Sequence, residues 1–234
     1  MMMPFNMPMQ QTRLRRATDR QGVMRQTVHG RPQLKGTALT KIHCLHWDFG
    51  DTLCDELSLW RLSPEWMEVY RSFSDGIGAA WSLGDVDTRG FVAELARRMP
   101  YSEEEIHLHL RRTDLFEFFP FTYSFFRAHY LPQAIVTVNP ALFTEVIVPG
   151  CLFEEVTDAI VVSAEERTID KGELCRRALE RMNIGCVPSQ ALLIDNKSEN
   201  LESWADHGGI GYLYTTDDTF KADVAEGLEG LVVH

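Results

Sequence analysis

The stretch His46-Trp47-Asp48-Phe49-Gly50-Asp51-Thr52-Leu53 decides the interpretation of this chain of 234 residues. It overlaps the mostly apolar run Ile42–Trp47, which has the length and composition of a parallel strand covered on both faces. Asp48 stands directly after this run. Because ligands bind at the carboxyl edge of open α/β sheets, Asp48 is the first candidate for a functional residue.

Further short apolar runs alternate with helix-like stretches along the chain. Besides Ile42–Trp47, the predicted strands are Ala134–Val138, Ala159–Val162, Ala191–Ile194 and Ile210–Tyr214. Between and after them, Lys171–Met182 has an apolar stripe at helical spacing, and Ser198–His207 is followed by two glycines that suit a helix end. This alternation predicts an α/β fold with a doubly wound, Rossmann-like parallel sheet.

One long interval interrupts the alternation, because it contains helix-like segments and no convincing strand. Its predicted helices are Pro64–Phe73, Thr88–Met99 and Ser102–Arg112. We therefore expect an inserted α-helical cap at 56–127 and a core formed by 41–55 and 128–234. The aromatic cluster Phe116–Phe126 is expected to pack the cap against the core, or alternatively to line an apolar substrate pocket.

The net charge of −11 is unevenly distributed. Residues 1–40 hold six arginines and one lysine against a single aspartate, so they carry about +6 and the remainder about −17. A body that acidic binds phosphate backbones poorly, so we expect no nucleic-acid partner. No apolar run approaches the roughly 18 residues that span a bilayer, so we also expect no membrane association.

Residues 1–40 are rich in Met, Gln and Arg and lack apolar periodicity, which predicts a disordered basic extension. We expect no secretory signal, because the segment has no apolar stretch. A mitochondrial transit peptide fits the composition in a eukaryote, and a start at Met24 or an earlier Met would make the preceding residues spurious. The five scattered cysteines favour a reducing cytoplasm. We expect a monomer or a homodimer.

Polar residues follow several of the predicted strands. Asp48 follows the first, Thr137 or Asn139 the second, and Asp195-Asn196 the fourth, while Lys171 opens the helix after the third. Two carboxylates, a hydroxyl and an ammonium at one sheet edge are stronger evidence of a site than one carboxylate is. Lysine is scarce, with five in the whole chain, so Lys171 is a conspicuous cation.

These elements resemble, in order, the four motifs of the haloacid dehalogenase superfamily. The segment Asp48–Leu53 resembles the first motif, Asp-x-Asp-Gly-Thr-Leu, and Ile135–Asn139 resembles the second, an apolar strand that ends in Ser or Thr. Lys171 matches the lone lysine of the third motif, and Leu192–Asn200 resembles the Asp-Asp-Ser-x-x-Asn form of the fourth. The predicted helical insertion resembles the cap of one subfamily.

The resemblance implies a Mg²⁺-dependent phosphatase that acts on a small phosphorylated metabolite. Asp48 would be the nucleophile and would form an aspartyl-phosphate. Thr137, Asn139 and Lys171 would bind the phosphate, with Thr137 and Lys171 also assisting catalysis. The ligands of Mg²⁺ would be the carboxylate of Asp48, the carbonyl of Gly50, and the pair Asp195 and Asn196.

Two positions depart from the family pattern. The second aspartate of the first motif, which protonates the leaving group, is replaced by Gly50, and Asp51 should point away because side chains alternate along an extended segment. Asn196 stands where a metal-binding aspartate is common. These departures leave two alternatives open. One is a non-catalytic or regulatory relative that binds a phosphorylated ligand. The other is a 2-haloacid dehalogenase, in which Arg61 or Arg71 would be the arginine that such enzymes usually have near the start of the cap.

Overall fold

The structure is a computed structural model that describes residues 42–71 and 76–228. The basic extension predicted for residues 1–40 lies outside these ranges, as does Phe73 at the end of one predicted helix. Every element described below belongs to one unit, Ala38–His234.

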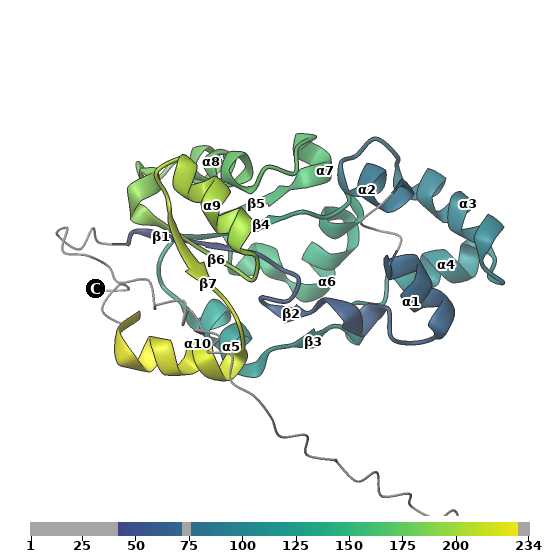
Figure 1. The fold of residues 1–234 in the computed structure, drawn as a ribbon, viewed down its shortest axis with the longest axis horizontal. Coiled ribbons are helices and arrows are strands. Elements are labelled where there is room, and N and C mark those ends of the chain that lie inside the picture. The colour runs from purple at the N-terminus through teal and green to yellow at the C-terminus, as the bar shows by residue number, and fades with distance from the viewer. Residues whose placement is uncertain (1–41, 72–75, 229–234) are drawn as a thin grey trace, which may run out of the picture. The chain divides into compact units, whose positions relative to one another are not determined.

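Five parallel strands form a single sheet in the order β5-β4-β1-β6-β7 (Figure 1). They are β1 (Cys44–Trp47), β4 (Gln133–Thr137), β5 (Ala159–Val162), β6 (Ala191–Asp195) and β7 (Ile210–Leu213). All five were predicted, with ends that differ by one or two residues at most. The first strand lies at the centre, and the chain builds outward from it on both sides, so the doubly wound α/β fold is confirmed.

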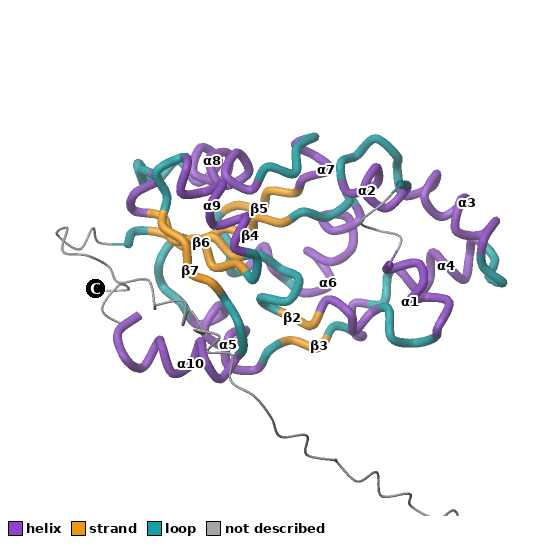
Figure 2. The backbone as a smooth tube through the Cα atoms, viewed as in Figure 1, coloured by secondary structure: helices purple, strands orange, loops and turns teal. Residues whose placement is uncertain are grey.

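Side chains that alternate along the strands build two apolar layers on opposite faces of the sheet. On one face, Trp47 belongs to a buried cluster with Phe126 of α5 (Pro120–Ala128) and Phe220 of α10 (Asp217–Asp223). On the other face, Cys44 belongs to a second cluster with side chains of α8 (Lys171–Met182) and α9 (Ser198–Asp206). Figure 2 shows the strands between these two sets of helices. The sheet is therefore covered on both faces, which explains why its strands are apolar throughout.

The helical insertion has an apolar core of its own. It contains α1 (Pro64–Arg71), α2 (Ile77–Ser82), α3 (Thr88–Arg98) and α4 (Glu103–Leu110). Its buried residues include Trp66, Trp81 and Phe91, together with Leu142 from the segment after β4. At the start of α4, Ser102 is the N-cap residue and accepts a hydrogen bond from the backbone nitrogen of Glu105. The predicted helical insertion is thus present.

Within the range 56–127 that we assigned to the cap, α5 behaves differently from α1 to α4. Its residue Phe126 is fully buried and packs edge to face with Trp47 of the central strand, with ring centroids 5.7 Å apart. The aromatic run therefore contributes to the core beneath the sheet as well as to the contact with the cap.

The remaining elements are short. The two-residue strands β2 (Cys54–Asp55) and β3 (Glu117–Phe118) pair antiparallel. The other helical segments are α6 (Val148–Cys151), α7 (Ser163–Glu166), the 3₁₀ turns η1 (Glu56–Leu59), η2 (Thr113–Leu115), η4 (Phe153–Glu155) and η5 (Pro188–Gln190), and the π-helical segments η3 (Phe143–Ile147) and η6 (Val224–Leu228). Among the described residues, no helix is both long enough and apolar enough to span a bilayer.

Candidate active site

Three of the predicted residues meet at the carboxyl edge of the sheet. Asp48 follows β1, Thr137 ends β4 and Asp195 ends β6, and these strands are neighbours. The backbone nitrogen of Asp48 donates to the carbonyl of Ile194 at 3.0 Å, which continues the pairing of β1 with β6. All three residues are buried, with Asp48 the most exposed at 8%. The parallel sheet therefore brings together residues that lie up to 147 positions apart in the sequence.

Lys171 joins two of these residues from the first position of α8. Its ammonium donates to Asp48 Oδ1 at 2.7 Å and to the carbonyl of Val136 at 2.9 Å. A third contact reaches Asp195 Oδ2 at 3.2 Å. The side chain is 1% exposed, so this ammonium is held by two carboxylates and a carbonyl away from water.

The position of Lys171 depends on how α8 begins. Asp170 caps the helix by accepting from the backbone nitrogen of Glu173 at 3.1 Å, and it also accepts from the hydroxyl of Ser203 at 2.6 Å. Ser203 lies on α9 and accepts in turn from the nitrogen of Gly172 at 2.8 Å. A β-carbon on Gly172 would lie 2.4 Å from the carbonyl oxygen of Ser203, so only glycine allows α8 and α9 this approach.

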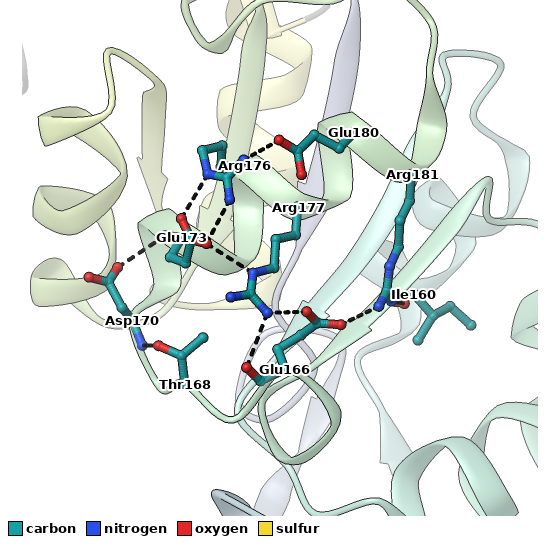
Figure 3. Close-up of polar contacts among 9 residues, drawn as sticks. All are labelled: Ile160, Glu166, Thr168, Asp170, Glu173, Arg176, Arg177, Glu180 and Arg181. Carbon is teal, nitrogen blue, oxygen red and sulfur yellow. Dashed lines mark hydrogen bonds and ion pairs between the residues drawn. The ribbon is translucent and has the colours of Figure 1, made fainter.

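Ion pairs on the outer side of α8 hold the same helix against the strand before it (Figure 3). Glu173 accepts from Arg177 at 2.9 Å, and both Arg177 and Arg181 pair with Glu166 of α7. Arg181 also donates to the carbonyl of Ile160 in β5 at 2.6 Å. Each exposed pair contributes at most about 1 kcal/mol. As a network they fix the direction of the helix that presents Lys171.

Five predicted site residues line one pocket of about 230 Å³: Asp48, Gly50, Thr137, Asn139 and Lys171. Within it, the side-chain amide of Asn139 donates to Thr137 Oγ1 at 2.7 Å. The lining also contains residues that were not predicted as site residues, among them Lys197 and Glu56. Lys197 adds a second, exposed cation at the rim. Its position within the fourth motif, Leu192–Asn200, was a signal for it, whereas no sequence signal pointed to Glu56.

Both carboxylate oxygens of Asp195 accept hydrogen bonds. Its Oδ1 accepts from the backbone nitrogen of Lys197 and from the side chain of Asn200, both at 2.9 Å, and its Oδ2 accepts from Asn200 and contacts Lys171. Asn200 therefore clamps the carboxylate in addition to belonging to α9. Asp195 lies behind Lys171 and is not part of the pocket lining.

The residues expected to hold Mg²⁺ offer oxygen atoms, which are the donor type that this ion prefers. The side-chain oxygen of Asn196 is buried and has no hydrogen-bond partner among the residues described, which suits a ligand oxygen. Asp48 retains one carboxylate oxygen beyond the one bonded to Lys171. Asp195 is already saturated, and within 42–71 and 76–228 no three acidic, His or Cys side chains form a metal-binding group. Asp48 and Gly50 line the pocket, whereas Asn196 and Asp195 are not part of its lining, so only two of the four expected ligands meet there, and the agreement with Mg²⁺ is one of donor type.

Burial and charge act against each other at the centre of the site. Burial raises the pKa of the Asp48 carboxyl above its ordinary value, and the ammonium of Lys171 opposes part of this rise. Burial lowers the pKa of Lys171, but Asp48 and Asp195 raise it more, so the net direction is above its ordinary value. Lys171 therefore stays charged at neutral pH and favours the ionised form of Asp48.

Asp51 does not take the place that Gly50 leaves open. Its backbone has a left-handed conformation, with φ of 54°, and its carboxylate accepts from the backbone nitrogen of Glu56 at 3.1 Å. It is also outside the pocket lining. Asp51 thus closes the turn after Phe49 and does not face the pocket.

The comparisons with known proteins place the fold. No protein-family model matches the chain, and no curated protein matches it in sequence. Among solved structures, a predicted HAD-like family hydrolase from Porphyromonas gingivalis matches with a TM-score of 0.62 and 13% identity, over 81% of this chain and 98% of that one. An L-2-haloacid dehalogenase from Xanthobacter autotrophicus matches with a TM-score of 0.58 and 13% identity, over 80% and 83%.

A HAD family enzyme from Bacteroides thetaiotaomicron, in complex with magnesium and inorganic phosphate, also matches. Its TM-score is 0.59 at 14% identity, over 75% of this chain and 95% of that one. Together with the sheet order and the helical insertion, these likenesses show that the chain has the haloacid dehalogenase-like fold. The resemblance that the four motifs indicated is confirmed at the level of the fold.

Proposed function

We propose that this protein is a phosphatase of the haloacid dehalogenase type, which hydrolyses a small phosphate ester through an aspartyl-phosphate on Asp48. The observation that carries the proposal is the grouping of Asp48, Lys171, Thr137 and Asn139 around one pocket at the carboxyl edge of the sheet. A nucleophilic carboxylate, a fixed ammonium and neutral donors are the groups that phosphoryl transfer requires.

Each of these side chains has a distinct part in the proposed reaction. Lys171 favours the ionised form of Asp48 and orients its carboxylate through the 2.7 Å hydrogen bond to Oδ1. Thr137 accepts from Asn139, which leaves its hydroxyl hydrogen for a phosphoryl oxygen. Asn139 has a second amide hydrogen for the same purpose. These groups bind the phosphate while the attack on phosphorus transfers it to Asp48.

Mg²⁺ is the proposed cofactor. Asp48, the carbonyl of Gly50 and Asn196 would hold it, and Asp195 would support the site through Lys171 and Asn200 without contacting the ion. When bound, Mg²⁺ would neutralise charge on the phosphate and reduce its repulsion by the Asp48 carboxylate. One neutral amide in place of a carboxylate predicts weak Mg²⁺ binding.

A panel of phosphomonoesters tests the proposal, with phosphate release measured with Mg²⁺ and with a chelator. The wild type, Asp48→Asn and Asp206→Asn are compared; Asp206 is an exposed aspartate at the end of α9 and serves as the matched control. We expect release by the wild type and the control, and none above background by Asp48→Asn. Absence of Asp48-dependent release from every activated ester would refute the proposal.

The same preparations separate the two alternatives. Halide release from a 2-haloacid without metal, lost in Asp48→Asn, would identify a dehalogenase. Thermal stabilisation by phosphate or vanadate without turnover would identify a protein that binds a phosphorylated ligand only.

A further inference from the structure

We propose that Glu56 is the catalytic acid and base of this site. The inference rests on the proposed function, because it assigns the group that protonates the departing oxygen of the phosphate ester. Its basis is the position of Glu56 against Gly50, at the point where the phosphate pocket meets the spaces open to the rest of a substrate.

The turn after β1 folds back and places Glu56 on Gly50. The backbone nitrogen of Asp51 donates to the carbonyl of Cys54 at 2.7 Å, and that of Leu53 donates to Phe49 at 2.9 Å. A β-carbon added to Gly50 would lie 3.1 Å from the carboxyl carbon of Glu56 and 3.2 Å from its Oε2. The carboxyl group of Glu56 therefore occupies the space into which a side chain at position 50 would extend.

Glu56 also borders more than one cavity. It lines the pocket that contains Asp48 and Lys171, and it lines an apolar cavity of about 60 Å³ with Phe49, Trp60 and other side chains. A wider space of about 760 Å³ on the side of the cap begins at the same residue. The oxygen that links phosphorus to the organic part of an ester must lie between the phosphate and either space, and Glu56 borders both routes.

The other carboxylates of the pocket do not suit the role. Asp48 is the nucleophile and is bonded to Lys171. Glu199 lies on the exposed side of α9 at the rim, where its carboxylate faces Ser198. Glu56 is the remaining carboxylate of the described pocket lining, and it is half-buried.

The proton balance assigns Glu56 both roles. In the first step a carboxylate oxygen of Asp48 forms a bond to phosphorus, and the bond from phosphorus to the ester oxygen breaks. That oxygen keeps the electron pair of the broken bond and takes the proton of the Glu56 carboxyl. The leaving group therefore departs as an alcohol, and Glu56 becomes a carboxylate. In the second step the Glu56 carboxylate takes a proton from water, the water oxygen bonds to phosphorus, and the bond to Asp48 breaks. Free phosphate forms, and both side chains return to their starting states.

The test is the dependence of the rate on the leaving group. An alkyl phosphate needs a proton on its departing oxygen, whereas nitrophenyl phosphate leaves readily as the anion. For Glu56→Gln we expect kcat/KM to fall about 10²–10⁴-fold on the alkyl ester and to stay near the wild-type value on the nitrophenyl ester. Glu202→Gln, at an exposed glutamate of α9, is the matched control and should change neither.

A second variant distinguishes the loss of the Glu56 carboxyl group from misfolding of the protein. Glu56→Ala vacates the space beside Gly50, and the backbone there is not left-handed, so a Gly50→Asp substitution in that background puts a carboxyl group into the same volume. Recovery of the alkyl-ester activity in this double variant would support the assignment.

Equal losses on both esters with an unchanged melting temperature, or no loss on the alkyl ester, would overturn the role of Glu56 and leave the proposed function standing. If the wild type itself shows no Asp48-dependent release, the proposed function fails, and the role of Glu56 fails with it.

Discussion

Replacing Lys171 with methionine should destabilise the protein strongly at neutral pH. The ammonium has three protons and three acceptors, Asp48 Oδ1 at 2.7 Å, the Val136 carbonyl at 2.9 Å and Asp195 Oδ2 at 3.2 Å. Methionine fills a similar volume but donates nothing, so two buried carboxylates and a carbonyl lose their partner. Removal of one member of a buried ion pair costs about 3–5 kcal/mol. We expect a loss of that size in the free energy of unfolding.

The loss should also depend on pH. Without Lys171, burial and the neighbouring Asp195 keep the pKa of Asp48 raised, and only the weaker effect of Lys197 at the rim opposes them. A carboxyl whose pKa is higher in the folded state contributes stability at low pH and loses it as the pH rises. The difference between variant and wild type should therefore be smaller near about pH 5 than near about pH 7.5.

Urea unfolding followed by tryptophan fluorescence at both pH values measures this difference. Lys221→Met is the control, because Lys221 is exposed and its ammonium lies 5.9 Å from the ring centroid of Phe121. Its effect should stay within about 0.5 kcal/mol. If Lys171→Met costs less than about 1 kcal/mol at neutral pH, the buried ion pair does not have the energetic role that its geometry implies.

Two further predictions concern the surroundings of the site. Both ring nitrogens of His46 are buried without a partner among the described residues, and burial lowers its pKa to about 3. Below about pH 6.5, the unfolded chain therefore binds a proton at His46 that the folded chain does not bind. The free energy of unfolding of the wild type should decrease as the pH is lowered, by at most about 1.4 kcal/mol per pH unit. His46→Leu should reduce this slope in urea unfolding, and an unchanged slope would contradict the assignment. Gly172→Ala would put a β-carbon 2.4 Å from the Ser203 carbonyl and should cost about 1–3 kcal/mol in stability while displacing Lys171. An unchanged melting temperature and phosphatase rate would show that the two helices adapt.

The sheet could be predicted because its physical requirement is simple. A parallel strand covered on both faces is apolar at every position, so each strand is a short hydrophobic run, and its last residue points to the ligand edge. Lys171 could be predicted for a related reason, since a single lysine at the start of a helix after a buried strand reaches that edge. Asp48, Thr137 and Lys171 were predicted in this way, and all three line one pocket in the structure.

Glu56 and the surroundings of Asp195 could not be predicted in the same way. The contact of Glu56 with Gly50 lies across a turn in which Asp51 adopts a left-handed conformation, and no residue pattern shows this. The hydrogen bonds of Asn200 to Asp195 depend on the approach of α9 to the sheet edge. The division between cap and core was obscured for another reason: α5 is aromatic on several sides, so its periodicity does not tell which body it covers.

The geometry around Lys171 also changes how the phosphate is expected to be recognised. All three ammonium protons already have acceptors in the protein, so a phosphoryl oxygen could gain a hydrogen bond from Lys171 only if one of these contacts broke. In the proposed reaction, Lys171 would therefore act on the phosphate mainly through its charge and through its hold on Asp48. Direct hydrogen bonds would come from Thr137, Asn139 and the rim cation Lys197, which line the same pocket. It follows that substitutions at Thr137 or Asn139 should weaken phosphate binding, whereas a substitution at Lys171 should act first on the stability and ionisation of the nucleophile.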